Sequence, residues 1–327
     1  MKRILVFLLT CVMVVTLAAC GGAADDDDDE DDDETPAVTT EATEAQADDT
    51  RNHQAPESTT GNLVVTFFGN LKVDQSVTWG DCTLMKMPDE SYVLVDSCEG
   101  GYENYIVQQL KDEGVTHIEC AFISHFHSDH YGGLMNFIDA FGIKKVYIDG
   151  FELDESISWN TNAAPLRGYI EKLQAKGVEV TTVMAGDSFE IGGAQFDILY
   201  PRQDTAGATT NDTSNVMSVS WDGKKVLFTG DLYYTGESAC LAEVDNELLK
   251  ADVLKIMHHG ANTSGSAEFI EAVSPKVAAC MGGHIMNNTG LRRYQKVGCE
   301  VYQVWETGDV HVMLTAGSDE LYVWTQQ

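Results

Sequence analysis

Three histidines and an aspartate lie within six residues of one stretch, Ile123-Ser-His-Phe-His-Ser-Asp-His-Tyr-Gly-Gly133. The whole chain has 327 residues and only 9 histidines, so this density needs a reason. Imidazole nitrogens and carboxylate oxygens are ligands that zinc, manganese and iron accept. His125 and His127 alternate along the chain, and Asp129 and His130 follow them directly, so one compact loop can present ligands to two cations. The stretch predicts a metal centre rather than a polar surface loop.

A buried strand must lead into this loop, and a helix must follow it. The apolar run at 118–123 predicts the strand, and the apolar spacing over 134–141 predicts the helix after Gly132-Gly133. Strands and helices alternate through the rest of the domain, which favours two packed sheets with helices outside. Further helices are predicted at 102–111, 165–175, 236–249 and 267–273. Further strands are predicted at 63–68, 83–87, 92–95, 145–148, 178–183, 189–191, 196–200, 216–221, 225–228, 253–256, 277–281, 310–314 and 321–324.

The first 20 residues have the pattern of a secretory signal. Lys2 and Arg3 precede an apolar run at 4–19 that is short for a membrane span and ends in small residues. Leu17-Ala18-Ala19-Cys20 resembles a bacterial lipobox, after which Cys20 would be lipidated and become the mature N-terminus. More than one acyl chain on one residue makes a stable anchor. We expect an exported protein, lipid-anchored to the outer face of the bacterial cell membrane; an ordinary signal peptide and a short uncleaved anchor are the alternatives.

The next segment, 21–61, is predicted to be a disordered acidic tether. It contains ten consecutive acidic residues, Asp25 to Glu34, and almost no large apolar side chains. Such a segment buries too little surface to offset its chain entropy, and its charges repel one another. Residues 62–327 are long enough to form one α/β domain with a full core.

The balance of charge limits the partners of this domain. The chain has 52 acidic and 20 basic residues. Without the 15 acids of the tether and without Lys2, Arg3 and Arg51, the domain keeps 37 acids and 17 bases, a net charge of −20. Sequence-independent binding of nucleic acid comes from Lys and Arg side chains that neutralise phosphates. We therefore expect no stable nucleic-acid complex.

Six cysteines remain in the domain, and in an exported protein they can form disulfides. Cys82 and Cys98 flank a predicted hairpin, so they are the first pair to test for a disulfide. Cys120 and Cys280 lie in apolar runs and are expected to pack as small buried side chains. The other two are Cys240 and Cys299.

The histidine loop resembles the H-x-H-x-D-H signature of the metallo-β-lactamase superfamily. Other segments resemble its competence-type group, the extracellular hydrolase domains of DNA-uptake channels. These segments are Gly80-Asp81, Ser91 to Asp96, Asn211-Asp-Thr-Ser214, Trp221 to Asp231, and His258-His259-Gly260 with Ser264. The resemblance covers residues 63–314. It implies an α/β (α+β) fold, a four-layer αββα sandwich of two mixed β-sheets with outer helices.

The resemblance also implies a centre of two divalent metal ions, with zinc expected and manganese as the alternative. Two ions would lower the pKa of a shared water, and the bridging hydroxide would attack a phosphorus or carbonyl centre. His125 and His127 would hold the first ion, Asp129 and His130 the second, and Asp231 both. The positions that match the family's metal and catalytic residues are His125, His127, Asp129, His130, Asp231, His258 and His259.

Several roles stay open in the sequence. One of His258 and His259 would complete the second site, and the other would contact the substrate or protonate the leaving group. Asp96 would accept hydrogen bonds from the ligand loop. Asn211 stands where many members supply a further histidine, which implies a first site that is weaker, open to water or filled by manganese. His284 lies where a late family motif is missing and is the candidate for a rebuilt substrate pocket.

Three functions remain after these observations. The first is a surface-anchored dinuclear hydrolase of a phosphodiester, a nuclease or phosphodiesterase. The second is a hydrolase of a small or cell-wall-linked ester, such as a phosphocholine-type ester or a lactone, which an acidic domain disfavours less. The third is a non-catalytic binding module that keeps the fold, and the intact ligand set argues against it. The missing histidine and the late His-His-Gly motif argue against a β-lactamase.

Overall fold

The computed structural model describes residues 54–69, 80–149, 166–202, 209–282 and 288–326. Cys20, the signal segment, most of the expected tether and His284 lie outside these residues. The described end of the tether, 54–61, lies against the domain: Tyr322 Oη donates to Gln54 O at 3.1 Å, and Gly61 N donates to Glu90 Oε1 at 3.1 Å. Among the described helices, none combines the length and apolar character needed to cross a membrane.

The first sheet has eight strands in the order β15-β14-β1-β2-β3-β4-β5-β6. β3 to β6 run parallel, and the other neighbours pair antiparallel. Its two C-terminal strands return to the N-terminal half, because β14 pairs with β1. The strands are β1 (Leu63–Phe67), β2 (Cys82–Lys86), β3 (Tyr92–Ser97), β4 (Cys120–Ile123), β5 (Lys145–Asp149), β6 (Glu179–Val183), β14 (Asp309–Leu314) and β15 (Leu321–Gln326).

The second sheet has seven strands in the order β13-β12-β11-β10-β9-β8-β7. β7 to β10 pair antiparallel, and β10 to β13 run parallel. The strands are β7 (Ser188–Ile191), β8 (Ala194–Tyr200), β9 (Val216–Trp221), β10 (Lys224–Phe228), β11 (Val253–Lys255), β12 (Val277–Cys280) and β13 (Glu300–Gln303). Both sheets are therefore mixed.

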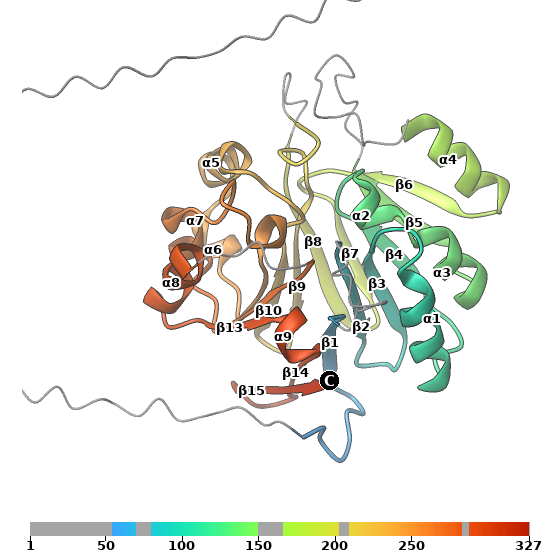
Figure 1. The fold of residues 1–327 in the computed structure, drawn as a ribbon, viewed down its shortest axis with the longest axis horizontal. Helices are drawn as coiled ribbons and strands as arrows, with labels where there is room; N and C mark the ends of the chain where they lie inside the picture. The colour runs from blue at the N-terminus through green and yellow to red at the C-terminus, as the bar shows by residue number, and fades with distance from the viewer. Residues whose placement is uncertain (1–53, 70–79, 150–165, 203–208, 283–287, 327) are drawn as a thin grey trace, which may run out of the picture. The chain divides into compact units, whose positions relative to one another are not determined.

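Helices cover the outer face of each sheet (Figure 1). The first sheet carries α1 (Glu103–Asp112), α2 (Ser128–Tyr131), α3 (Leu134–Phe141) and α4 (Leu166–Ala175). The second carries α5 (Tyr234–Glu243), α6 (Asn246–Leu249), α7 (Ala267–Val273) and α8 (Asn288–Lys296), and the short α9 (Val304–Thr307) precedes β14. One apolar core lies between the sheets, where Phe122 of β4 stacks on Phe196 of β8 at 5.4 Å, and two further cores lie under the helices. The predicted four-layer αββα sandwich is confirmed.

Some predicted elements differ from the structure. The helix predicted at 236–249 is two helices, because Val244 is extended and the Asp245 carboxylate accepts a hydrogen bond from Glu247 N, which starts a new helix. α8 and β13 were not predicted. The described part of α8 is mostly polar and includes a glycine, and β13 is a half-buried edge strand without clear alternation.

The six cysteines of the described domain are buried free thiols. Cys82 and Cys98, the pair expected first for a disulfide, are neighbours but remain two free thiols. Burial raises the pKa of the Cys82 thiol well above its usual value. Cys120 and Cys280 are 3% and 0% exposed and pack in the cores, as the sequence predicts.

Candidate metal centre

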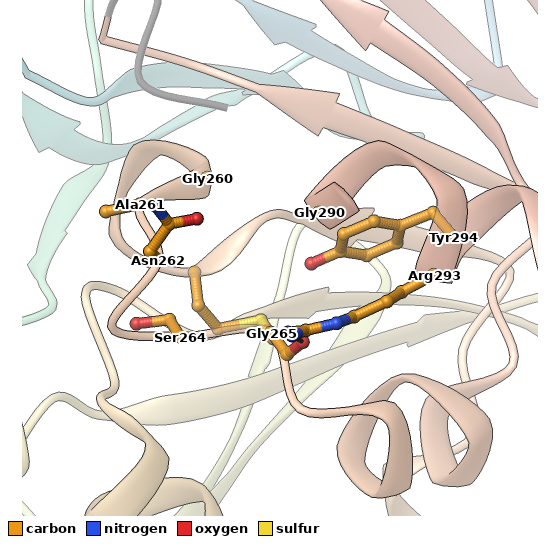
Figure 2. A pocket seen from close by; sticks show the side chains of 9 residues that line it. Gly260, Ala261, Asn262, Ser264, Gly265, Gly290, Arg293 and Tyr294 are labelled. Carbon is orange, nitrogen blue, oxygen red and sulfur yellow. Dashed lines mark hydrogen bonds between the residues drawn. The ribbon is translucent and has the colours of Figure 1, made fainter. Parts of the chain in front are cut away.

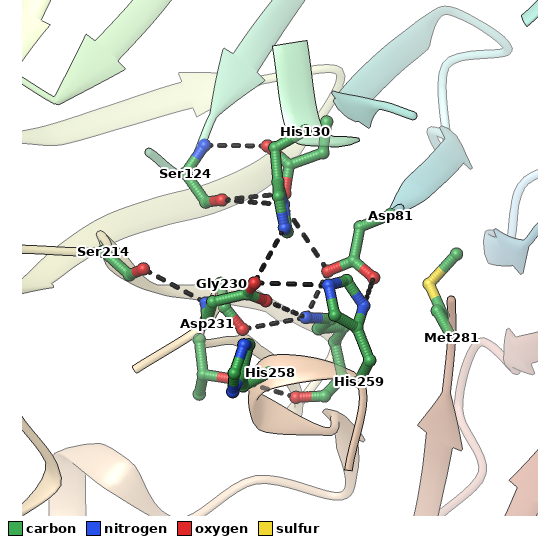
Figure 3. A network of polar contacts seen from close by, with 12 residues as sticks. Asp81, Ser124, His130, Ser214, Gly230, Asp231, His258, His259 and Met281 are labelled. Carbon is green, nitrogen blue, oxygen red and sulfur yellow. Dashed lines mark hydrogen bonds and ion pairs between the residues drawn. The ribbon is translucent and has the colours of Figure 1, made fainter. Parts of the chain in front are cut away.

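The site residues leave the ends of neighbouring strands in both sheets. In the first sheet, Asp96 lies near the end of β3 and the histidine loop follows β4, which runs parallel to β3. In the second sheet, Asp231 follows β10 and His259 follows β11, which runs parallel to β10. Parallel strands bring these ends to one edge of each sheet. Figure 3 shows side chains from both sheets pointing toward one another there, among them His130, Asp231 and His259.

His125, His127 and Asp231 form a first ligand group, with donor atoms within 4.8 Å of one another. The Ser124 hydroxyl lies 3.0 Å from His125 Nδ1, which leaves Nε2 of that ring for the centre. His125 Nε2 lies 3.0 Å from His127 Nδ1 and 3.8 Å from Asp231 Oδ2. Three donor atoms therefore converge on one position.

A second ligand group consists of Asp129, His130, Asp231 and His259. Asp231 Oδ2 lies 3.1 Å from His130 Nε2 and 3.2 Å from His259 Nε2, and Asp129 Oδ2 lies 3.3 Å from the same nitrogen of His259. Asp231 is thus the member that both groups share, and a single oxygen faces both. Ser214 Oγ accepts a hydrogen bond from Asp231 N at 3.1 Å and helps to hold it.

An aspartate stands behind each imidazole of the second group. His130 Nδ1 lies 2.9 Å from Asp96 Oδ2, and Asp96 also accepts hydrogen bonds from the backbone and hydroxyl of Ser124, both at 2.8 Å. His259 Nδ1 lies 3.3 Å from Asp81 Oδ1. A carboxylate on Nδ1 fixes the ring and makes Nε2 a better donor to a metal. Sequence reasoning assigned no role to Asp81, although an acidic residue directly before a buried strand was a usable signal.

Lys255 is a further residue that sequence reasoning missed. Its ammonium, 3% exposed, forms an ion pair with Asp81 Oδ2, lies 3.4 Å from Asp231 Oδ1 and donates to Gly230 O at 2.8 Å. Asp81, Asp96 and His130 form a third group of ligand type. Because Lys255 already places a positive charge beside Asp81, this third group does not need a metal ion.

The structure distinguishes His258 from His259. Among the described residues, His258 belongs to neither ligand group; its Nδ1 lies 2.6 Å from Thr263 Oγ1, and its ring lies edge-on to Tyr233 with centroids 4.8 Å apart. Both histidines have positive φ, 43° and 53°. This turn sends His259 into the centre and leaves His258 half-buried at its rim. His259 is therefore the ligand candidate of the pair.

Two further residues support the centre without joining it. The buried side chain of Asn211 lies beside His127 and Tyr233, so it backs the first group from the position where a further histidine was missing. Gly282 packs against His259: a Cβ there would lie 2.4 Å from Nδ1, and its φ of +82° also disfavours side chains. Only a glycine leaves room for the ring.

The two groups differ in their electrostatics. Burial lowers the pKa of His125 well below its usual value and also lowers the pKa of His127. Burial would lower the pKa of His130 and His259 as well, but facing carboxylates, Asp231 above all, raise both well above the usual value. Burial likewise opposes ionisation of Asp231, but the cations and imidazoles around it hold its pKa well below the usual value. The centre is built to keep its carboxylates charged.

These residues fit divalent cations. Imidazole nitrogens and carboxylate oxygens from several strand ends meet within metal-ligand reach, in a buried position. The fully buried His130 Nε2 makes no hydrogen bond, although Asp231 Oδ2 is near. A buried polar atom of this kind is expected to have a partner, and a cation would supply it.

A small cavity lies behind the turn that carries His258 (Figure 2). Its volume is about 10 Å³, enough for roughly one water. Arg293 Nη1 borders it and donates to Tyr234 Oη at 2.9 Å and to Gly265 O at 2.5 Å. These hydrogen bonds of Arg293 brace the loop after the histidine pair. The cavity itself is too small for a substrate.

Comparisons with known proteins agree with this geometry. The chain is 29% identical over 199 residues to ComE operon protein 3 of Bacillus subtilis (strain 168). The aligned segment covers 60% of this chain and 24% of that protein. It is 28% identical over 179 residues to competence protein ComA of Neisseria gonorrhoeae, and this aligned segment covers 55% of this chain and 22% of that protein. The chain therefore spans about a quarter of the length of these relatives.

Solved structures and the family pattern extend the comparison. The CmlA beta-hydroxylase E377D mutant has a TM-score of 0.50 and 15% identity, covers 80% of this chain and 55% of its own, and shows a shared fold. The sequence pattern of the metallo-beta-lactamase superfamily matches residues 80–284. That match covers more than half of the chain and contains both ligand groups. The chain belongs to the metallo-beta-lactamase superfamily of metallo-hydrolases.

Proposed function

We propose that this chain is a dinuclear metal-dependent hydrolase of a phosphodiester. The observation that carries the proposal is the position of Asp231 Oδ2, which lies 3.8, 3.1 and 3.2 Å from the Nε2 atoms of His125, His130 and His259. One carboxylate oxygen that faces both ligand groups can bridge two ions. Two divalent ions held there would lower the pKa of a shared water and neutralise charge that develops on the substrate.

The proposed ions are zinc, with manganese as the alternative. The second group offers two imidazoles and two carboxylates, and the first offers two imidazoles and the shared carboxylate. Zinc accepts both ligand types in four-coordinate sites. With fewer protein ligands, the first group leaves more room for water or substrate.

His258 is the proposed hydrogen-bond donor to the substrate or to the leaving-group oxygen. Burial lowers its pKa, so the ring is mostly neutral near pH 7. If the Thr263 hydroxyl donates to Nδ1, the ring carries its proton on Nε2, which is then available to the departing oxygen. Burial raises the pKa of Tyr233, so its hydroxyl stays protonated and can donate a hydrogen bond at the same rim.

A phosphodiester is the preferred substrate class, because the sequence resembles the hydrolase domains of DNA-uptake channels and one relative is named competence protein ComA. The net charge of −20 on residues 62–327 opposes a stable complex with nucleic acid. The same charge disfavours the second candidate less; this candidate is a small or cell-wall-linked ester such as a phosphocholine-type ester or a lactone.

We also propose that Cys20 anchors the chain to the outer face of the cell membrane. The proposal rests on the sequence Leu17-Ala18-Ala19-Cys20, which precedes the described residues. Mass spectrometry of the mature protein would then find a diacyl or triacyl N-terminal cysteine. Cys20→Ala should release the protein from membranes, and unchanged membrane association of that variant would contradict the anchor.

Metal analysis combined with hydrolysis assays tests the enzymatic proposal. We expect two divalent ions per chain and faster turnover of bis(p-nitrophenyl) phosphate than of a phosphocholine ester. His127→Ala should lose one ion and most of the activity, whereas the control His117→Ala changes an exposed histidine outside the centre and should lose neither. A chain without bound metal, or a fully active His127→Ala variant, would contradict the mechanism. Activity on single-stranded DNA that falls steeply with salt would indicate a polymer substrate.

A further inference from the structure

A buried lysine lies directly behind the candidate centre. Lys255 ends β11, and the side chains before it in that strand, Val253 and Leu254, are apolar and fully buried. Burial of an ammonium costs several kcal/mol unless carboxylates and hydrogen bonds compensate it. Lys255 has such compensation from Asp81, Asp231 and the Gly230 carbonyl oxygen. A lysine placed at this position acts on the same carboxylates as the centre.

Lys255 faces one oxygen of Asp231, while the imidazoles face the other. Asp231 Oδ1 lies 3.4 Å from the ammonium, whereas Oδ2 lies 3.1 and 3.2 Å from His130 Nε2 and His259 Nε2. In Asp81, Oδ2 pairs with Lys255 and lies 3.7 Å from His130 Nδ1, while Oδ1 lies 3.3 Å from His259 Nδ1. The ammonium therefore holds one oxygen of each carboxylate and leaves the other oxygen to the nearest imidazole.

We propose that Lys255 is a fixed third cation of the centre, a positioning residue that makes the site favour an anionic substrate. The inference rests on the proposed two-metal centre. Asp81, Asp96, Asp129 and Asp231 supply four negative charges, which two divalent ions would balance. The charge of Lys255 would keep the centre neutral once the proposed bridging hydroxide is bound; without Lys255 the centre would carry one net negative charge. This local charge offsets the acidic balance of the domain and favours a phosphodiester over a neutral ester or lactone.

Loss of the Lys255 charge and a general loss of structure can be separated, because they change the affinities for zinc and for phosphate differently. Loss of the charge should move the two affinities in opposite directions, whereas loss of structure should lower both. Lys255→Met removes a positive charge near both the metal ions and the substrate. By Coulomb's law, zinc should then bind more tightly and inorganic phosphate more weakly, each by about tenfold. A general loss of structure would weaken both ligands together. Lys255→Arg keeps the charge and should leave both affinities within about threefold of the wild type.

The experiment uses the full chain, zinc competed against a chromophoric chelator, and calorimetric titration of the zinc-loaded protein with inorganic phosphate. Lys224→Met is the matched control. Lys224 is also 3% exposed, but it contacts Asp222 and the Ser318 carbonyl oxygen, outside both ligand groups. Lys224→Met should lower the melting temperature and leave both affinities unchanged.

If Lys255→Met does not fold, Asp81→Asn provides a test of opposite sign. It removes a negative charge from the same pair, so zinc should bind more weakly and phosphate more tightly. Affinities that fall together, or that do not change, in the folded variant overturn the role of Lys255 and leave the metal centre intact. A wild-type chain that binds no zinc or manganese overturns both the proposed function and this inference.

Discussion

The two ligand groups share Asp231 but are supported in different ways. In the first group, His125 contacts the Ser124 hydroxyl and His127 contacts the Asn211 amide, so both imidazoles are backed by neutral groups. In the second group, an aspartate lies behind each imidazole, Asp96 behind His130 and Asp81 behind His259. A second carboxylate, Asp129, joins only this group.

This difference predicts two unequal metal sites. A carboxylate behind an imidazole fixes the ring and strengthens it as a donor, and residues of this kind commonly change metal affinity by about 10- to 100-fold. The second group therefore offers the tighter site. We expect an ion to exchange and substrate to approach at the first group, which has fewer donors and a partly exposed His127.

Asp231→Asn should have the largest effect, because it changes the residue that the two groups share. Loss of the charge weakens both sites, and we expect activity to fall by roughly 1000-fold. Metal content after dialysis and the rate on bis(p-nitrophenyl) phosphate measure the result. Asp245→Asn is the control, because asparagine caps a helix as well as aspartate does. If Asp231→Asn lost only one ion, Asp231 would not be shared.

Single ligand removals should separate the groups. His259→Ala takes a donor from the tighter site, and we expect its metal affinity to fall by about 100-fold, against about tenfold at the weaker site for His127→Ala. Stepwise titration of each apo variant with zinc measures both affinities. Equal losses in the two variants would show that the aspartates behind the second group give it no advantage.

Supporting residues should show the same asymmetry with smaller effects. Asp96→Asn keeps a side chain that tolerates the positive φ of 55° but removes the charge behind His130, so we expect about tenfold weaker binding at the second site. Asn211→Ala removes a neutral polar neighbour of His127 and should weaken the first site by about fivefold. Titrations with zinc give both values. A larger effect from Asn211→Ala would reverse the comparison.

His311 provides a reference for a buried histidine outside both groups. It contacts Thr66 and stacks on Trp324, and burial lowers its pKa to about 4. The pKa of His311 is lower in the folded chain than in the unfolded chain. As the pH falls, the unfolded chain therefore binds a proton at His311 before the folded chain does. Stability should therefore be lost as pH falls below about 6.5, by about 2 kcal/mol at pH 5. Urea unfolding at pH 7 and 5 should show this loss in the wild type and a smaller one in His311→Gln; equal losses would contradict the assignment.

Local patterns predicted much of this protein. Buried apolar runs marked most strands of both sheets, and 3.6-residue spacing marked most helices. The pairing of β14 with β1 joins residues about 250 positions apart, and no local pattern encodes such a register. The break between α5 and α6 depends on one capping side chain, Asp245, whose effect competes with the apolar spacing around it.

The metal-binding chemistry could be predicted from the order of residues alone: histidine and aspartate at metal-ligand spacing follow one buried strand, and an aspartate follows another. Which histidine of the late pair enters the centre depends on the fold, because a turn with two positive φ values sends His258 and His259 in different directions. The fold also decided the roles of Asp81 and Lys255. Asp81 directly precedes a strand of the first sheet, and Lys255, 174 positions later, ends a strand of the second. Their charges can interact only where strand ends from both sheets meet and exclude water.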